Sequence, residues 1–182
     1  KPEGGLWTSS TYIANFKELD KVTITYEAEA NGTVNLVSET INPEIGEPKG
    51  STATANAGYE FAGWYVGEKK VSGEADLTKE VIDANAKLNG AYVATTFTAK
   101  FIEKAKVTIT YEAEANGTVN RVSETINPEI GIPNGSTATA NAGYEFAGWY
   151  VGENKVSEIA ELTKEVIDAN AKLNGAYVTT TF

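Results

Sequence analysis

The chain has 182 residues, of which 25 are acidic and 15 are basic, for a formal net charge of −10. This balance excludes proteins that bind nucleic acid or anionic membrane surfaces, because both need clusters of basic side chains. Cysteine and histidine are absent, which excludes disulfides, thiolate metal sites and the commonest general base. No apolar run approaches the roughly 20 residues of a membrane-spanning helix, so we expect no direct membrane insertion.

Self-similarity is the strongest feature of the sequence. Shifting the chain by 85 positions places Lys21–Phe97 on Lys106–Phe182, and only eight of these 77 positions differ. The same shift places Gly5–Phe16 on Gly90–Phe101. Because methionine is also absent, we interpret the chain as a piece of a longer array of repeats.

The alignment sets the expected boundaries. Residues 1–20 are expected to be the closing strand of a preceding repeat, 21–103 repeat one, and 104–182 repeat two, truncated before its final strand residues. Apolar side chains alternate along the orphan closing strand, at residues 6–16. We expect this strand either to lie along the neighbouring repeat one of its own molecule or to be captured by the open edge of another molecule's second repeat.

The periodicity of apolar residues predicts the elements of repeat one in chain order. Val22–Tyr26 alternates as a half-buried strand, and an Asn-Gly turn follows at 31–32. Thr33–Ile41 returns as a second strand, and a loop rich in proline and glycine comes next. Ser51–Ala57 is small and polar, which predicts an edge strand. Gly58–Val66 is the aromatic strand at the centre of the repeat.

A helix is predicted after the aromatic strand. Its apolar stripe consists of Leu77, Val81, Ala84 and Leu88. Thr78 is the predicted N-cap, Leu77 and Ile82 form a hydrophobic staple, and Gly90 takes the left-handed position at the C-terminal end. A long strand at Tyr92–Phe101 closes the repeat. This order predicts an α+β fold, a sheet with one helix packed on it.

The core and the surface are predicted from the same pattern. The predicted core residues are Val22, Ile24, Phe61, Val81 and Leu88 in repeat one and Val107, Ile109, Phe146, Val166 and Leu173 in repeat two. The pairs Leu36/Arg121, Glu47/Ile132 and Glu74/Ile159 exchange an apolar residue for a charged one between the repeats. A buried position would not accept both types, so these positions are predicted to face solvent or an edge.

The aromatic strand carries a family resemblance. The run Gly58–Tyr65, of sequence GYEFAGWY, recurs at Gly143–Tyr150, and Phe97–Phe101 closes the first repeat. With the opening strand and its Asn-Gly turn, this pattern resembles the Listeria–Bacteroides repeat, also called the internalin B-type B repeat. The resemblance implies tandem β-grasp-like (ubiquitin-like) modules, each a mixed sheet with one helix packed on it. It also implies an extracellular location on the bacterial cell surface, with cell-wall anchoring through a region outside this sequence, and no catalytic residues.

That fold predicts an elongated molecule. Its first and last strands lie side by side and parallel, which sends the chain ends to opposite poles. The junction at Ile102–Ala105 is about four residues long and contains no glycine or proline, so the repeats are predicted to form a stiff rod.

The sequence offers two kinds of candidate site. Trp64, Tyr65, Trp149 and Tyr150 are candidates for ligand contact by stacking on a sugar, although aromatic residues on a central strand usually belong to the core. The acidic residues Glu27, Glu29, Glu44, Asp76 and Asp83 could bind calcium, but they lack the spacing of a calcium loop and are typical of a solvated face. No catalytic, cofactor or metal site is predicted, and we expect a protein that is not an enzyme.

The sequence is compatible with two functions. In the first, the repeats are a spacer or stalk of an adhesin-like surface protein that projects another domain from the cell wall. In the alternative, they are multivalent binding modules for host glycan or protein. In either case the expected partners are the adjacent repeats of the same chain, with no nucleic acid, and the expected state is a monomer.

Overall fold

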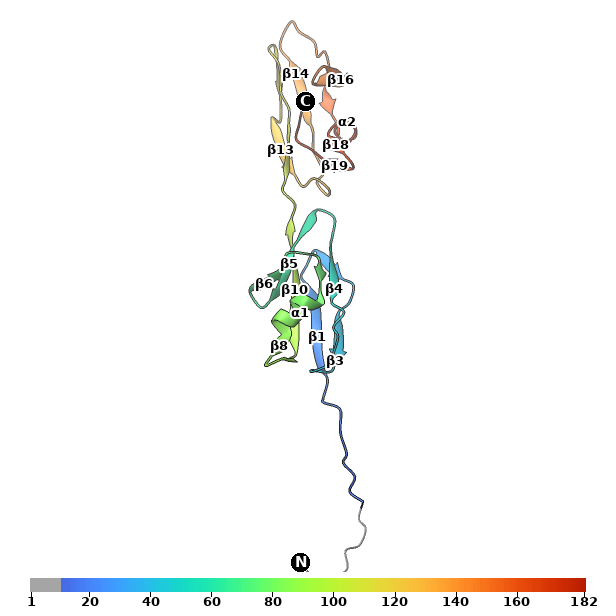
Figure 1. The fold of residues 1–182 in the computed structure, drawn as a ribbon. Coiled ribbons are helices and arrows are strands. Elements are labelled where there is room, and N and C mark those ends of the chain that lie inside the picture. Colours follow the sequence, from blue (N-terminus) through green and yellow to red (C-terminus); the bar gives the residue numbers. More distant parts are fainter. Residues whose placement is uncertain (1–10) are drawn as a thin grey trace, which may run out of the picture.

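The computed structural model describes residues 11–182 and contains two repeats stacked end to end (Figure 1). Residues 11–20 extend from the free end of repeat one without a helix or strand. Tyr12 and Phe16 in this segment are 93% and 95% exposed, so it does not lie along repeat one. The remainder of the predicted orphan strand, at 6–10, lies outside the described residues.

The main sheet of repeat one has five strands. Their order is β3 (Ser38–Ile41), β1 (Val22–Ala28), β10 (Thr95–Glu103), β5 (Tyr59–Val66) and β6 (Lys69–Ser72). The first and last long strands, β1 and β10, pair in parallel at the centre, as predicted, and the other neighbours are antiparallel. Because β1 and β10 run in the same direction, the chain enters repeat one at one end and leaves it at the other (Figure 1).

Smaller elements cover this sheet. A three-stranded sheet contains β2 (Gly32–Val34), β4 (Ser51–Ala55) and β7 (Asp76–Leu77), and helix α1 (Lys79–Ala86) leads into the hairpin of β8 (Lys87–Leu88) and β9 (Ala91–Tyr92). Each repeat is thus mostly β-sheet with one short helix, which is compatible with the α+β class.

Two of the predicted strands were wrong in detail. The predicted strand Thr33–Ile41 is divided into β2 and β3, which belong to different sheets. At the break, the Asn35 side chain accepts hydrogen bonds from Ser51 Oγ at 2.9 Å and Thr52 N at 2.8 Å, which tie it to β4. The predicted edge strand β4 is paired on both sides, by β2 and β7, and its small residues fit because Ser51 and Ala53 are buried.

The predicted helix is too long. It ends at Ala86, and Leu88 and its equivalent Leu173 are both 64% exposed, so neither belongs to the core. The reason is a two-residue turn at Asn89 and Gly90, whose φ angles are 53° and 88°, which starts the β8–β9 hairpin. Gly90 is therefore left-handed as predicted, but in a hairpin turn and not at a helix end.

The helix also buries a different face from the predicted one. Ile82 and Ala86 are fully buried, whereas Ala84 is exposed. Leu77 is buried as predicted. Thr78 occupies the N-cap position but makes no capping hydrogen bond with its side chain.

A bulge in β5 builds the aromatic core. Lys100 pairs with Gly63 while Phe101 pairs with Phe61, which leaves Ala62 as an extra residue. The bulge brings Phe61 and Trp64 to the same face, with ring centroids 6.1 Å apart. Strict alternation would have placed them on opposite faces.

The other core predictions hold. Ile24 and Ile109 are fully buried, and the remaining predicted residues are partly buried and pack on the two core clusters: Val22, Phe61, Val81, Val107, Phe146 and Val166. The exchanged positions Glu47, Glu74, Ile132 and Ile159 are exposed, as predicted. Leu36 is half-buried and packs on the core, whereas Arg121 is exposed.

Repeat two has the same order of elements. They are β11 (Val107–Thr110), β12 (Gly117–Val119), β13 (Ser123–Ile126), β14 (Ser136–Ala140), β15 (Trp149–Val151), β16 (Asn154–Ser157), β17 (Glu161–Leu162), α2 (Lys164–Asn170), β18 (Lys172–Leu173), β19 (Ala176–Tyr177) and β20 (Thr180–Thr181). Three of these strands, β11, β15 and β20, are shorter than their equivalents β1, β5 and β10. Within the described residues, no helix is long and apolar enough to span a membrane.

Candidate functional site

The two repeats meet at the turn before the aromatic strand of repeat one. Gly58 in this turn donates its N–H to Glu129 Oε2 at 2.7 Å. Its carbonyl oxygen accepts hydrogen bonds from Asn127 Nδ2 and from the Lys104 N–H, both at 2.9 Å. Since Gly58 belongs to repeat one and Asn127 and Glu129 belong to repeat two, these bonds hold the repeats to each other. We call this contact the inter-repeat junction.

Charged groups reinforce the junction. Lys104 Nζ forms an ion pair with Glu129, and Asn127 Nδ2 also donates to Glu103 Oε1 at 3.3 Å. The hydrogen bond from Gly58 and the ion pair with Lys104 lower the pKa of the Glu129 carboxyl. Glu129 is thus a negatively charged acceptor near neutral pH. The short linker therefore bonds to both repeats: Lys104 contacts Gly58 in repeat one and Glu129 in repeat two. Strand β10 continues through Glu103 directly into this linker.

Gly58 has a backbone conformation that favours glycine, and repeat two packs against it. Its φ angle is +82°, and a Cβ built there would lie 2.7 Å from Ile130 Cδ1 and 3.0 Å from Asn127 Oδ1. The equivalent Gly143 has a φ of +87° and nothing within 4 Å of such a Cβ. The two glycines share one backbone conformation, but only Gly58 is covered by a neighbouring repeat.

Part of the same contact exists on the other side of repeat one. Asn42, the equivalent of Asn127, donates from Nδ2 to Glu18 Oε1 at 3.4 Å, and Glu18 is the equivalent of Glu103. Ile45, the equivalent of Ile130, is 80% exposed, compared with 51% for Ile130. The free end of repeat one therefore carries the residues of a second junction without a repeat docked on them in this structure.

The sequence-predicted aromatic residues divide into two groups. Trp64 and Trp149 are 0% and 3% exposed, and their Nε1–H groups donate to the carbonyl oxygens of Ala75 and Ala160 at 2.9 and 3.0 Å. Both indoles therefore lie in the core with their polar groups satisfied. Tyr65 and Tyr150 lie at the surface, where Tyr65 is half-buried and has Lys100 Nζ 4.9 Å from its ring centroid.

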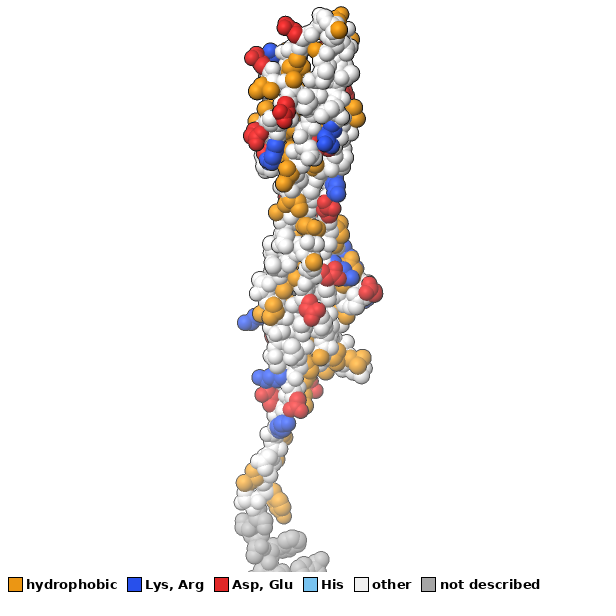
Figure 2. Space-filling model, turned by 180° about the vertical axis from the view of Figure 1, so that it is seen from behind, with side chains coloured by type: hydrophobic (Ala, Val, Ile, Leu, Met, Phe, Trp, Pro, Cys, Tyr) orange, Lys and Arg blue, Asp and Glu red, His pale blue; other side chains and the backbone are white. Residues whose placement is uncertain are grey.

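Acidic side chains are spread out in ion pairs and hydrogen bonds. Among residues 11–182, no group of three or more acidic residues is placed to hold a metal ion. Acidic and basic side chains intermingle on the face seen in Figure 2, and neither sign gathers in one large patch there. Asp83, one of the calcium candidates, instead receives hydrogen bonds from Lys79 Nζ at 2.6 Å and from the Tyr92 hydroxyl.

The sequence reasoning missed these tyrosine–carboxylate pairs. The Tyr26 hydroxyl donates to Glu39, and the equivalent Tyr111 hydroxyl donates to Glu124 Oε1 at 2.5 Å. Burial and these hydrogen bonds raise the pKa of both tyrosines. The pairing depends on strand register and side-chain direction, for which the sequence held no motif.

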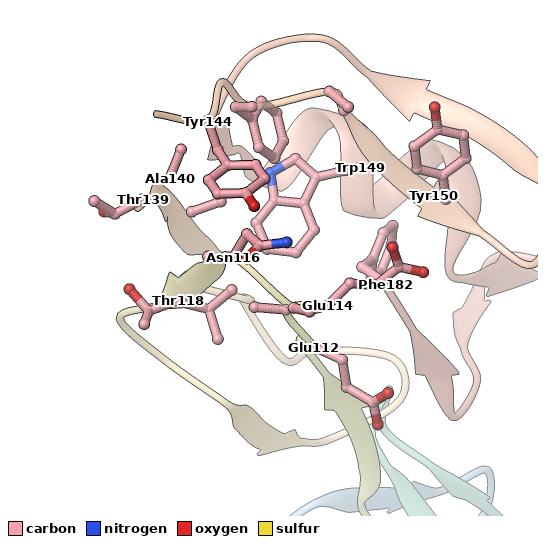
Figure 3. A pocket seen from close by; sticks show the side chains of 18 of the residues that line it. Glu112, Glu114, Asn116, Thr118, Thr139, Ala140, Tyr144, Trp149, Tyr150 and Phe182 are labelled. Atoms are coloured by element: carbon pink, nitrogen blue, oxygen red, sulfur yellow. The ribbon is translucent and has the colours of Figure 1, made fainter. Parts of the chain in front are cut away.

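Repeat two contains a slot of about 740 Å³. Figure 3 shows Glu112, Glu114, Asn116 and Thr118 on one side of it, Tyr144 and Trp149 on the other, and Phe182 at one end. The corresponding segments of repeat one, β1 through Ala28 and β5 from Tyr59, both pair with β10. In repeat two, residues 112–115 and 145–148 are not strands, and no strand of residues 11–182 pairs with them.

Two near-identical β-rich units, locked together through a hydrogen-bonded turn, define a tandem-repeat protein. The chain belongs to the divergent InlB B-repeat family, whose sequence model matches residues 22–104 and again 107–180. This confirms the resemblance found in the sequence. The family consists of repeat domains of bacterial surface proteins and is not typical of enzymes. No curated protein and no solved structure matches the chain.

Proposed function

We propose that these repeats are a spacer that projects another domain of a surface protein away from the bacterial cell wall. The inter-repeat junction is the observation that supports this role. Three hydrogen bonds converge on the backbone of Gly58, and an ion pair between Lys104 and Glu129 lies beside them. A junction with so many specific contacts has a single preferred geometry, which a rigid stalk needs and a flexible string of binding domains does not.

A β-grasp-like topology is part of the same proposal. The parallel central pair of β1 and β10, with α1 between β7 and the closing strand, agrees with this fold. In such a unit every added repeat lengthens the rod, because the entry and exit strands point the same way.

The distance between the two repeats can be measured to test this proposal. The chain has no cysteine, so cysteines placed at the exposed equivalents Glu68 and Glu153 can carry one spin label each. Double electron–electron resonance spectroscopy should then give one narrow distribution of distances between the two labels. A broad distribution, or a second population at short distance, would contradict a rigid stalk.

A matched pair of variants makes the test specific. Gly58→Ala should broaden the distribution, because the added methyl group would collide with Ile130 in the junction. Gly143→Ala imposes the same backbone strain where nothing lies within 4 Å, so the distribution should stay narrow. Equal effects of the two variants would show that the junction does not set the geometry.

A further inference from the structure

The two strands that carry the chain into and out of repeat one are paired with each other. Strand β1 follows the entry point at Lys21, and β10 runs directly into the linker to repeat two. The two strands are parallel over five residue pairs, which begin at Ile24 and Thr95. Entry and exit lie at opposite ends of the repeat (Figure 1), so tension along the rod pulls β1 and β10 in opposite directions along their own length.

This direction of pull loads all the hydrogen bonds between the two strands together. The bonds of a parallel pair are evenly spaced and cross from one strand to the other. Strands pulled in opposite directions along their length must break these bonds at the same time, whereas strands pulled apart from one end break them one after another. An antiparallel pair of entry and exit strands would bring both chain ends to the same end of the repeat and would open in this second way.

Neither strand lies at an edge of the main sheet. β1 is also paired with β3, and β10 is also paired with β5, so each strand is held by a neighbour on both sides. Beyond the end of β1, the Glu29 N–H donates to the Ala99 carbonyl oxygen at 2.9 Å, which continues the contact with β10. To leave the sheet under tension, β1 or β10 must therefore break its hydrogen bonds to two strands.

Side chains hold the same two strands in register. Tyr26 and Phe97 are opposite each other, both are buried, and their rings stack with centroids 6.2 Å apart. The Tyr26 hydroxyl donates to Glu39 of β3, and Glu39 also accepts the N–H groups of Lys49 at 2.9 Å and Gly50 at 3.3 Å. Sliding β1 along β10 would therefore separate two buried rings and pull the Tyr26 hydroxyl away from its acceptor.

We propose that the parallel pair of β1 and β10 is a mechanical clamp, which keeps repeat one folded when the projected domain is pulled away from the cell wall. This inference rests on the proposed spacer role and adds a property that rigidity alone does not supply. A rod with one preferred geometry can still unfold under a weak pull if its terminal strands open one hydrogen bond at a time. With the clamp, repeat one keeps its length under tension.

The test is single-molecule force spectroscopy of the full chain, with handles attached to two introduced cysteines. Lys21→Cys with Ile102→Cys pulls β1 and β10 in opposite directions along their length. Lys21→Cys with Ala94→Cys pulls the same strands apart from one end, because Ala94 directly precedes the partner of Ile24. All three replaced positions are exposed, and the chain has no cysteine of its own.

The force that unfolds repeat one should be higher for the pair 21 and 102 than for the pair 21 and 94, by about twofold or more. Unfolding under force depends on the unfolding rate and not on the equilibrium stability. The two variants should therefore differ in unfolding force while they share one unfolding temperature in the absence of force, and each is the matched control of the other.

Equal unfolding forces in the two directions, or a higher force for the pair 21 and 94, would overturn the clamp. The spacer role is tested separately by the distances between the spin labels. A narrow distance distribution together with equal unfolding forces would leave the rigid spacer in place and reject the clamp. A broad distribution together with a large difference in force would reject the rigid spacer and leave a chain of repeats that resist tension.

Discussion

The rings of Phe61 and Phe101 lie edge to face with their centroids 5.9 Å apart, which joins β5 to the closing strand β10. Phe61 also packs edge to face on Trp64, at 6.1 Å. In repeat two the equivalent Phe146 keeps its contact with Trp149, at 5.9 Å, but no counterpart of Phe101 is packed against it among the described residues. The same residue thus has two environments in one chain.

This difference gives the first prediction. Phe61→Ala should lower the free energy of unfolding of repeat one by about 3 kcal/mol, because it removes a large partly buried ring with two aromatic neighbours. Phe146→Ala should cost repeat two roughly 1 kcal/mol less, since one of these neighbours is missing. Hydrogen exchange of buried amides, followed by NMR under added denaturant, measures each repeat separately. Equal losses in the two repeats would contradict the role assigned to β10.

The second prediction concerns the corrected face of α1. Ile82→Ala should destabilise repeat one by about 3 kcal/mol, because Ile82 is fully buried in the core cluster. Leu88→Ala should change it by less than about 0.5 kcal/mol, because Leu88 is mostly exposed in the hairpin. Thermal unfolding of both variants is the measurement. A larger loss of stability for Leu88→Ala than for Ile82→Ala would favour the helix face predicted from the sequence, which contains Leu88.

The failure at Leu88 shows where sequence reasoning stops. Apolar periodicity placed Leu88 on the helix, while the Asn-Gly pair that follows it is a strong hairpin signal and decided the local structure. In β5, alternation alone separates Phe61 from Trp64, and only the bulge at Ala62 reunites them. The strand Val22–Tyr26, by contrast, was predicted correctly because its alternation is uninterrupted and one face is buried.

The inter-repeat junction had no sequence signal for a different reason. Its contacts join Gly58 to Asn127 and Glu129, about 70 positions further along the chain. Each of these residues is also present in the other repeat, as Gly143, Asn42 and Glu44, so the sequence cannot distinguish a docked copy from a free one.

The third prediction is a loss of stability in acid that depends on Asp83. Burial alone would raise the pKa of Asp83, but hydrogen bonds from Lys79, Tyr92 and Lys87 outweigh it and lower the pKa to about 2. In the unfolded chain an aspartate has a pKa of about 3.9. A carboxyl whose pKa is lowered by folding adds stability above the unfolded value and loses it as the pH falls through the folded one.

The unfolding temperature should therefore fall between about pH 4 and pH 2, and Asp83→Asn should reduce this dependence. The variant should also be less stable than the unmodified chain at neutral pH, because it loses the ion pairs with Lys79 and Lys87. Unfolding curves followed by circular dichroism at several pH values provide the measurement. If the variant kept the full acid dependence, the contribution would have to come from other carboxyl groups, such as Glu124, whose pKa is also lowered, since its hydrogen bonds outweigh its burial.

The last prediction separates the inter-repeat junction from the local turn that carries it. Asn127 Oδ1 accepts the N–H groups of Glu129 and Ile130 at 3.0 and 3.3 Å, and Asn42 makes the same two bonds at the same distances in repeat one. Replacing either asparagine by alanine therefore removes the same turn. Only Asn127 also donates to Gly58, so Asn127→Ala should cost about 1 kcal/mol more than Asn42→Ala. The additional loss should appear as faster hydrogen exchange at the Gly58 amide, which donates to Glu129. In a chain that already carries Gly58→Ala, Asn127→Ala should no longer cause this additional loss. Equal costs for the two asparagine variants would mean that the repeats are held together without this hydrogen bond.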